Sequence, residues 1–233
     1  MSSRILSLFI LTLSLLWPRT AIAETSIMGE QEADTERMYQ FVASRNPDFS
    51  REIASAFHEV GDIYGIRGDI ALCQAIIETG WFRFHNGTAV RPEDHNYCGL
   101  GVHTQGERGC RFESVHEGVT AMIQHLYAYA CDDDLPEGER VTDPRFKFVR
   151  RGVAPTWEAL SGRWAMNQNY GRHILDIYAS MMRFQPKPVE VETIEVRIPD
   201  HDRSAPAADN DDSRDVPEGN DGPTVQWDVI MTN

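Results

Sequence analysis

Apolar residues recur at helical spacing in several segments of the chain. Between residues 50 and 64 they follow one another at steps of three and four, at Ile53, Phe57, Val60 and Ile63, and Gly65 comes next as a natural helix stop. Residues 70–77 are apolar nearly all round, which is typical of a helix buried on every side, and they lead directly into Glu78. The pattern predicts an amphipathic helix followed by a central buried one.

Further helices are predicted on both sides of this pair. Ser114 and Glu117 have the spacing of a capping box ahead of a helix that reaches about Ala130. Shorter apolar patterns predict helices over residues 156–162 and 170–184, and a lead-in helix around Phe41.

A Gly-rich stretch, residues 96–113, interrupts the helices. It holds two short extended pieces, residues 97–100 and 110–112, joined through residues 105–109. This arrangement favours a small β-hairpin. The predicted fold is therefore mainly α (α+β), a helical lobe with a small β-hairpin lobe.

The two ends of the chain differ from the middle. Arg4, an apolar run from residue 5 to 17 and the small residues Ala21 and Ala23 indicate a cleaved signal peptide over residues 1–23, with an uncleaved anchor as the alternative. A polar lead-in over 24–49 and a catalytic domain over 50–184 follow. Residues 185–233 hold 6 of the 12 prolines, and we expect this acidic tail to be disordered, apart from a possible edge strand over 189–198.

The formal net charge of the chain is −14, and the tail, with 12 acidic and 4 basic side chains, contributes −8 of it. The remainder stays acidic, which argues against nucleic acid or an anionic membrane as a partner. We expect no integral membrane association and a periplasmic or extracellular location.

The four cysteines form an even set in a chain that is expected to be exported. Two disulfides are predicted, with buried free thiols as the alternative. Cys98 and Cys110 flank the turn of the expected hairpin, and Cys73 and Cys131 would then join two helices.

Glu78 is the residue that most suggests chemistry. Burial disfavours the charged form of a carboxylic acid, so its pKa should rise, as a proton donor to a glycosidic oxygen requires. Trp81 and Phe82 follow it and offer an apolar wall and a stacking surface for a sugar. Taken without its sequence context, Glu78 is more simply interpreted as a partly exposed glutamate at a helix end, without a function.

Several blocks in this order resemble the glucosaminidase domain of glycoside hydrolase family 73, found in autolysins and flagellar peptidoglycan hydrolases. They are residues 74–81, 96–101, 112–118, 143–146, 151–157, 164–165 and 169–171, so the resemblance covers roughly residues 50–183. It implies a lysozyme-like fold with a groove between the two lobes, Glu78 as the catalytic acid and Tyr170 as an aromatic residue of the cleft.

Other residues of the expected cleft have competing structural readings. Tyr170 is expected to bind substrate or to pack, and Asn96 to bind a sugar or to fix the hairpin, while the aromatic side chains can line the cleft or the core: Trp81, Tyr97, Trp157 and Trp164. Glu107, at the expected hairpin tip, is the candidate second carboxylate, with an ordinary surface charge or a substrate acetamido nucleophile as alternatives.

The predicted function is cleavage of peptidoglycan on the reducing side of N-acetylglucosamine, without a cofactor. A muramidase or lytic transglycosylase and a non-catalytic wall-binding module are the alternatives, and an envelope or secretion partner is possible. A zinc site near Cys98 and Cys110, built from His85, His95 and His103, is disfavoured because these residues lack a paired ligand motif.

Overall fold

The computed structural model describes residues 23–85, 89–102 and 108–188. The helices within these ranges are α1 (Thr35–Ala43), α2 (Arg51–Tyr64), α3 (Gly68–Thr79), α4 (Val115–Ala130) and α5 (Tyr170–Arg183), with single 3₁₀ turns at η1 (Pro92–Asp94), η2 (Phe146–Phe148) and η3 (Glu158–Leu160). The prediction of a mainly α fold is confirmed. Within the described ranges no helix is long and apolar enough to cross a membrane.

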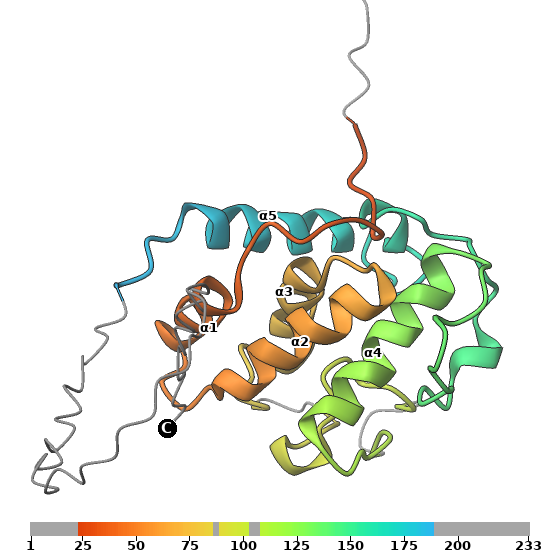
Figure 1. Cartoon of the computed structure of the whole chain (residues 1–233), viewed down its shortest axis with the longest axis horizontal. Helices are drawn as coiled ribbons and strands as arrows, with labels where there is room; N and C mark the ends of the chain where they lie inside the picture. The colour runs from red at the N-terminus through yellow and green to blue at the C-terminus, as the bar shows by residue number, and fades with distance from the viewer. Residues whose placement is uncertain (1–22, 86–88, 103–107, 189–233) are drawn as a thin grey trace, which may run out of the picture. The chain divides into compact units, whose positions relative to one another are not determined.

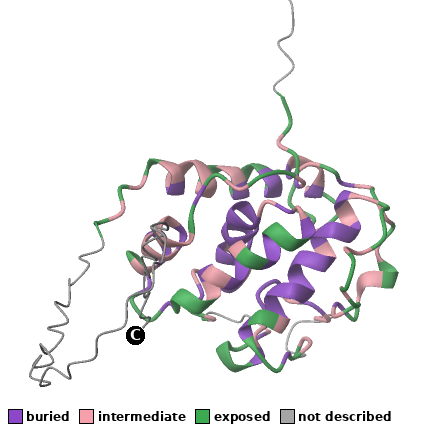
Figure 2. Cartoon of the chain, viewed as in Figure 1, coloured by how far each residue is buried: buried purple, intermediate pink, exposed green. Residues whose placement is uncertain are grey.

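The helices are arranged around α2 and α3 (Figure 1). Helix α2 packs against both α3 and α4, and α3 packs against α5 on its other side. Buried residues concentrate on α2, α3 and α4, as Figure 2 shows. Helix α3 is thus the central element, which explains why its sequence is apolar on nearly every face.

The connection from α2 to α3 is unusually close. Ser50 caps the start of α2 by accepting a hydrogen bond from the Glu52 N–H, and Gly65 ends it in the left-handed conformation, at φ 61°. A Cβ on Gly68 would lie 2.0 Å from the carbonyl oxygen of Phe57. Only glycine permits that approach, which brings the beginning of α3 directly against α2.

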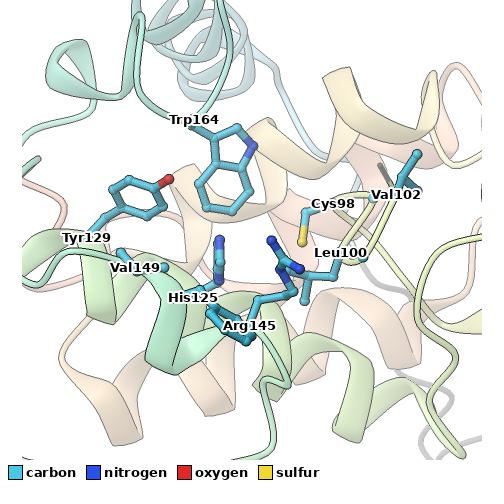
Figure 3. Close-up of a pocket in the computed structure, with 11 residues that line it drawn as sticks. Cys98, Leu100, Val102, His125, Tyr129, Arg145, Val149 and Trp164 are labelled. Carbon is cyan, nitrogen blue, oxygen red and sulfur yellow. The ribbon is translucent and has the colours of Figure 1, made fainter. Parts of the chain in front are cut away.

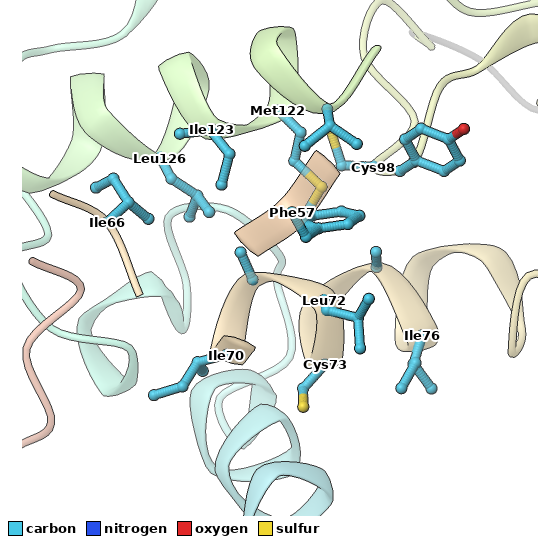
Figure 4. Close-up of a cluster of buried hydrophobic side chains, with 14 of the residues drawn as sticks. Phe57, Ile66, Ile70, Leu72, Cys73, Ile76, Cys98, Met122, Ile123 and Leu126 are labelled. Atoms are coloured by element: carbon cyan, nitrogen blue, oxygen red, sulfur yellow. The ribbon is translucent and has the colours of Figure 1, made fainter. Parts of the chain in front are cut away.

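The apolar core lies where α2, α3 and α4 meet. Figure 4 shows Phe57 between Leu72 of α3 and Met122 of α4, and all three side chains are fully buried. The core continues toward Ile66 and Leu126 in the same view. Helix α3 also buries three polar side chains completely, Asp69, Gln74 and Thr79.

The lead-in belongs to the same folded unit. Ile27, Met38, Phe41 and Phe49 are buried in the core, although they precede residue 50. The backbone also connects it, since Gly29 N–H donates to the Gly65 carbonyl at 2.9 Å. The folded part therefore begins well before α2.

Two predicted elements differ in the structure. The segments expected to form a hairpin lie side by side, with Cys110 N–H donating to the Leu100 carbonyl at 2.7 Å, but neither is a strand, and residues 103–107 lie outside the described ranges. Asn96 holds these segments together through its own side chain, in place of a regular ladder. The helix predicted over 156–162 is only the turn η3, because Gly162 turns the chain back at φ 74°.

The signal peptide over residues 1–23 lies outside the described ranges except for Ala23, and most of the tail also lies outside them. The structure therefore leaves both predictions as they were, including the edge strand over 189–198.

Candidate active site

Glu78 occupies the last turn of α3, just beyond the core. Its helix ends at Gly80, which takes the left-handed conformation at φ 61°. Gln74 lies one turn earlier and is fully buried, whereas Glu78 is partly exposed. Residues four apart share a helix face, so both polar side chains point the same way.

Tyr170 bridges these two side chains. It is the first residue of α5 and only 4% exposed. Its hydroxyl accepts a hydrogen bond from Gln74 Nε2 at 2.9 Å and donates one to Glu78 Oε1. The beginning of α5 is held close to the preceding chain, since a Cβ on Gly171 would lie 2.1 Å from the Trp157 carbonyl oxygen. Packing of α5 thus determines where the tyrosine hydroxyl meets the acid.

The surroundings of Glu78 favour its protonated form. Burial raises the pKa of Glu78 above its ordinary value, while hydrogen bonds from Tyr170 and from the Trp164 side chain lower it in part. Position at the negative end of the α3 dipole disfavours the carboxylate further. Burial and the nearby Glu78 charge raise the pKa of Tyr170 well above its ordinary value, so the tyrosine remains a donor.

A pocket of about 270 Å³, slightly smaller than the usual ligand site, lies close to this acid. Figure 3 shows Tyr129, Trp164, His125 and Arg145 around it. We call it the Trp164 pocket, and its lining residues are Cys98, Gly99, Leu100, Gly101, Val102, His125, Tyr129, Arg145, Phe148, Val149 and Trp164.

Two residues connect the Trp164 pocket to Glu78. Trp164 lines the pocket and hydrogen-bonds the carboxylate. Cys98 also lines it, and its pKa is raised well above the ordinary value by burial and then by the charges of Glu78 and Asp143. Glu78 itself does not line the pocket. Glu78 is connected to the pocket through Trp164 and Cys98.

Trp81 lies away from this pocket, although it is close to Glu78 in sequence. Its ring lies 4.4 Å from the Arg45 guanidinium and packs against Phe41, with ring centroids 5.6 Å apart. It lines a separate cavity of about 160 Å³, together with Asp176 and other residues of α5. The left-handed backbone at Trp81, φ 63°, turns it toward α1.

Asn96 and Tyr97, also predicted to bind substrate, are buried. Asn96 Nδ2 donates to the carbonyls of Leu100 and Cys110, each at 2.9 Å, and its Oδ1 accepts from Leu100 N–H at 3.0 Å. Tyr97 packs against Phe57, with ring centroids 6.0 Å apart. Asn96 therefore shapes the loop that lines the Trp164 pocket, and Tyr97 anchors that loop in the core.

The structure contains neither predicted disulfide, because all four cysteines are free thiols. The Cys73 thiol is buried and donates to the Asp69 carbonyl within α3, whereas the Cys131 thiol donates to the Tyr127 carbonyl at the end of α4. Each of these sulfurs faces its own helix. Cys98 and Cys110 lie near enough for their charges to interact, but no bond joins them.

Glu107 and His103 lie outside the described residues, so the proposed second carboxylate stays a sequence prediction. In the part of the chain that the structure describes, no three metal-ligating side chains come together. Trp157, another cleft candidate, is fully buried in the core.

Four residues of the Trp164 pocket were not predicted to line the site, although Arg145 lies in the motif block 143–146. His125 and Tyr129 occur one turn apart in α4, and Arg145 and Phe148 lie in the irregular segment after it. The available signal was His125 between the buried residues Gln124 and Leu126 of α4, but a partly buried histidine within a core has the same pattern.

Comparison with known proteins identifies a family and two similar proteins. Residues 54–183 match the family model for glucosaminidase, described as mannosyl-glycoprotein endo-β-N-acetylglucosaminidase. An uncharacterized protein of Borreliella burgdorferi is 30% identical over 162 residues, which cover 68% of this chain and 78% of that protein. The crystal structure of the catalytic domain of the autolysin Auto from Listeria monocytogenes is 16% identical, with a TM-score of 0.38, and the match covers 65% of this chain and 87% of that chain. The family match includes Glu78, Tyr170 and every residue of the Trp164 pocket.

Proposed function

Because this chain belongs to the glucosaminidase family of glycoside hydrolases, we propose that it hydrolyses peptidoglycan. The bond it cleaves is the β-1,4 bond on the reducing side of N-acetylglucosamine, and Glu78 is the general acid. The enzyme works outside the cytoplasm, in the periplasm or the surrounding medium, where this polymer lies.

The observation that carries the proposal is the environment of Glu78. Burial raises its pKa, and the side chains that hydrogen-bond it, Tyr170 and Trp164, are neutral donors. A carboxylic acid that must transfer a proton near neutral pH needs such a setting, because a nearby cation would hold it ionised.

The aromatic lining of the Trp164 pocket suits a carbohydrate. Trp164 and Tyr129 lie 5.6 Å apart between ring centroids, and Phe148 is 65% exposed at the same pocket. Such faces pack against the apolar side of a pyranose ring. The N-acetylglucosamine unit is held here, with its glycosidic oxygen turned toward Glu78.

Hydrolysis then begins with proton transfer from Glu78 to the glycosidic oxygen as the C1–O4 bond breaks. Tyr170 orients the carboxyl group through its hydroxyl, and Gln74 in turn orients Tyr170. The carboxylate that forms is stabilised by the hydrogen bonds from Tyr170 and Trp164, because a charged acceptor binds a donor more tightly than a neutral one. Held in this way, the acid needs little reorganisation during the reaction.

Muramidases and lytic transglycosylases use a comparable glutamate acid, so the products discriminate among the three activities. Purified sacculi are digested, the fragments are reduced with borohydride and the new ends are identified by mass spectrometry. N-acetylglucosamine at the new reducing ends supports the proposal. Muramic acid or its anhydro form at those ends would contradict it.

A wall-binding module without turnover is the alternative from a different class. Such a module gains nothing from burying a carboxylic acid, because burial costs free energy and contributes no affinity for a neutral sugar. Binding of sacculi without release of soluble fragments would establish that alternative.

A further inference from the structure

A second polar pair borders the Trp164 pocket on the side of α4. His125 Nδ1 lies 2.7 Å from Asp143 Oδ2, and Asp143 is only 1% exposed. The other carboxylate oxygen of Asp143 accepts the Arg145 N–H at 2.7 Å. Gln124 holds the same loop by accepting the N–H of Asp143 at 2.9 Å. The carboxylate is therefore fixed from several directions and is turned toward the imidazole.

This contact determines which imidazole nitrogen carries the proton. A carboxylate accepts hydrogen bonds, so His125 donates from Nδ1. In the neutral tautomer that this contact selects, the lone pair is on Nε2. The imidazole ring has two aromatic neighbours. The ring centroid of Trp164 lies 5.0 Å away, and that of Tyr129, one turn along α4, lies 5.5 Å away. Figure 3 shows the His125 side chain extending toward Trp164 among the residues that line the pocket.

One indole ring connects this imidazole to the acid. The Trp164 side chain hydrogen-bonds Glu78, and the face of His125 packs against the same ring system at 80°. Inverting glycosidases place their acid and their base roughly 6.5–9.5 Å apart, so that a water molecule fits beside the sugar. His125 and Glu78 both contact Trp164 and do not contact each other, which is the kind of arrangement that leaves room for a water molecule.

Among the described residues that line the pocket, no other group offers a base. Among the described residues of the Trp164 pocket there is no carboxylate. Burial raises the pKa values of Cys98 and Tyr129, which keeps both protonated, and Arg145 is a cation. His125 is the remaining side chain with an available lone pair.

We propose that His125, oriented by Asp143, is the general base of this enzyme and takes the place of the second carboxylate usual in glycoside hydrolysis. The proposal rests on the proposed function, with Glu78 as the acid. Water attacks C1 of N-acetylglucosamine and passes a proton to His125 Nε2. The C1–O4 electron pair leaves with O4, which takes the proton of Glu78. The products are an α-anomeric N-acetylglucosamine end and a free 4-hydroxyl, and solvent returns the proton from His125 to Glu78.

The test compares His125→Asn with His116→Asn, an exposed histidine of the same helix α4. The asparagine amide at position 125 still donates to Asp143, which protects the fold, but it has no basic nitrogen. Turnover of soluble glycan strands by His125→Asn should fall about 100- to 10,000-fold with KM unchanged, as expected for loss of a general base. His116→Asn should match the wild type, and circular dichroism should be unaltered in both variants.

Two readouts separate a base from a structural residue. The wild type should release the α-anomer first, observed by proton NMR before mutarotation. Azide, a nucleophile that needs no base, should restore turnover to His125→Ala and yield the α-glycosyl azide. Release of the β-anomer, unimpaired His125→Asn, or a loss in Glu107→Gln as large as that in His125→Asn would each overturn the proposal.

The same measurements distinguish the two proposals. If the wild type forms N-acetylglucosamine ends and Glu78→Gln does not, while His125→Asn remains fully active, only the role of His125 fails. If the wild type forms no such ends, the proposed function fails, and the role of His125 fails with it.

Discussion

Helix α3 contains two acidic side chains near its opposite ends, and their surroundings differ in almost every respect. Asp69 in the first turn is fully buried, faces the Arg67 guanidinium at 3.2 Å and accepts the backbone N–H of Glu32 at 2.9 Å. Glu78 in the last turn is partly exposed and has the neutral partners Tyr170 and Trp164.

The helix dipole accentuates the difference. The N-terminal end of a helix favours an anion and the C-terminal end disfavours one. Asp69 at the N-terminal end accepts the N–H groups of residues 32 and 33 and thereby ties the lead-in to α3. Burial at the other end raises the pKa of Glu78. The comparison teaches that a buried carboxyl group serves structure where cations and N–H groups surround it, and chemistry where its donors are neutral.

The largest effect is expected from Glu78→Gln. The amide preserves the shape of the side chain but cannot donate the proton, so the rate of sacculus digestion should fall at least about a thousandfold. The melting temperature should stay close to that of the wild type. Glu59→Gln, an exposed change on α2, is the matched control. Turnover of Glu78→Gln within tenfold of the wild type would refute the assignment.

Asp69→Asn should show the opposite pattern. It leaves the guanidinium of Arg67 without its buried partner, which is expected to cost about 3 kcal/mol of unfolding free energy. Urea denaturation measures this loss, and Glu59→Gln again serves as the control. Activity per folded molecule should be unchanged. A stable Asp69→Asn variant with reduced turnover would contradict the assignment of Asp69 to structure and Glu78 to chemistry.

Trp164→Phe and Trp81→Phe form a matched pair. The first removes a hydrogen bond to Glu78 and should lower kcat about tenfold, as for the loss of one hydrogen bond of roughly 1.4 kcal/mol. The second alters only the cavity beside α1 and should leave kcat unchanged. Steady-state kinetics on soluble glycan strands measure kcat for both variants. An equal loss of kcat in the two variants would contradict the placement of Trp81 outside the active site.

Tyr170→Phe removes the other hydrogen bond to Glu78, and the readout specific to this variant is the pH profile. Activity requires protonated Glu78 and is lost as pH rises through the pKa of that group. The Tyr170 hydroxyl lowers this pKa by stabilising the carboxylate, so its removal raises the pKa, and the alkaline limb moves to higher pH. The measurement is kcat against pH, and a limb displaced to lower pH would contradict the proposed role of the hydroxyl.

Periodicity predicted the long elements well. Helices α2, α4 and α5 follow the predicted residues closely, because each has an apolar face and a capping residue or a glycine near one end. The predictions of the short elements were wrong. Residues 156–162 form only a turn, and the segments of the expected hairpin are held by the Asn96 side chain, without a strand. Side-chain hydrogen bonds of this kind leave no periodic pattern in a sequence.

The candidate site was predicted in part. Glu78 and Tyr170 were found through their motif blocks, and the structure brings them into contact. Trp81 is adjacent to Glu78 in sequence, but the left-handed turn after α3 directs it to another cavity. Asp143 lies in one of the motif blocks but His125 does not, and the fold of the loop after α4 creates their contact.

The sequence by itself determined which helix is central, because a segment apolar on nearly every face can only be buried. It also determined that an acid stands at the end of that helix. Tertiary structure alone decided what surrounds the acid, since Tyr170, Trp164 and Cys98 come from distant segments. Local order in a sequence determines periodicity and caps, whereas the pKa of a carboxyl group depends on burial and on neighbours that only the folded chain brings together.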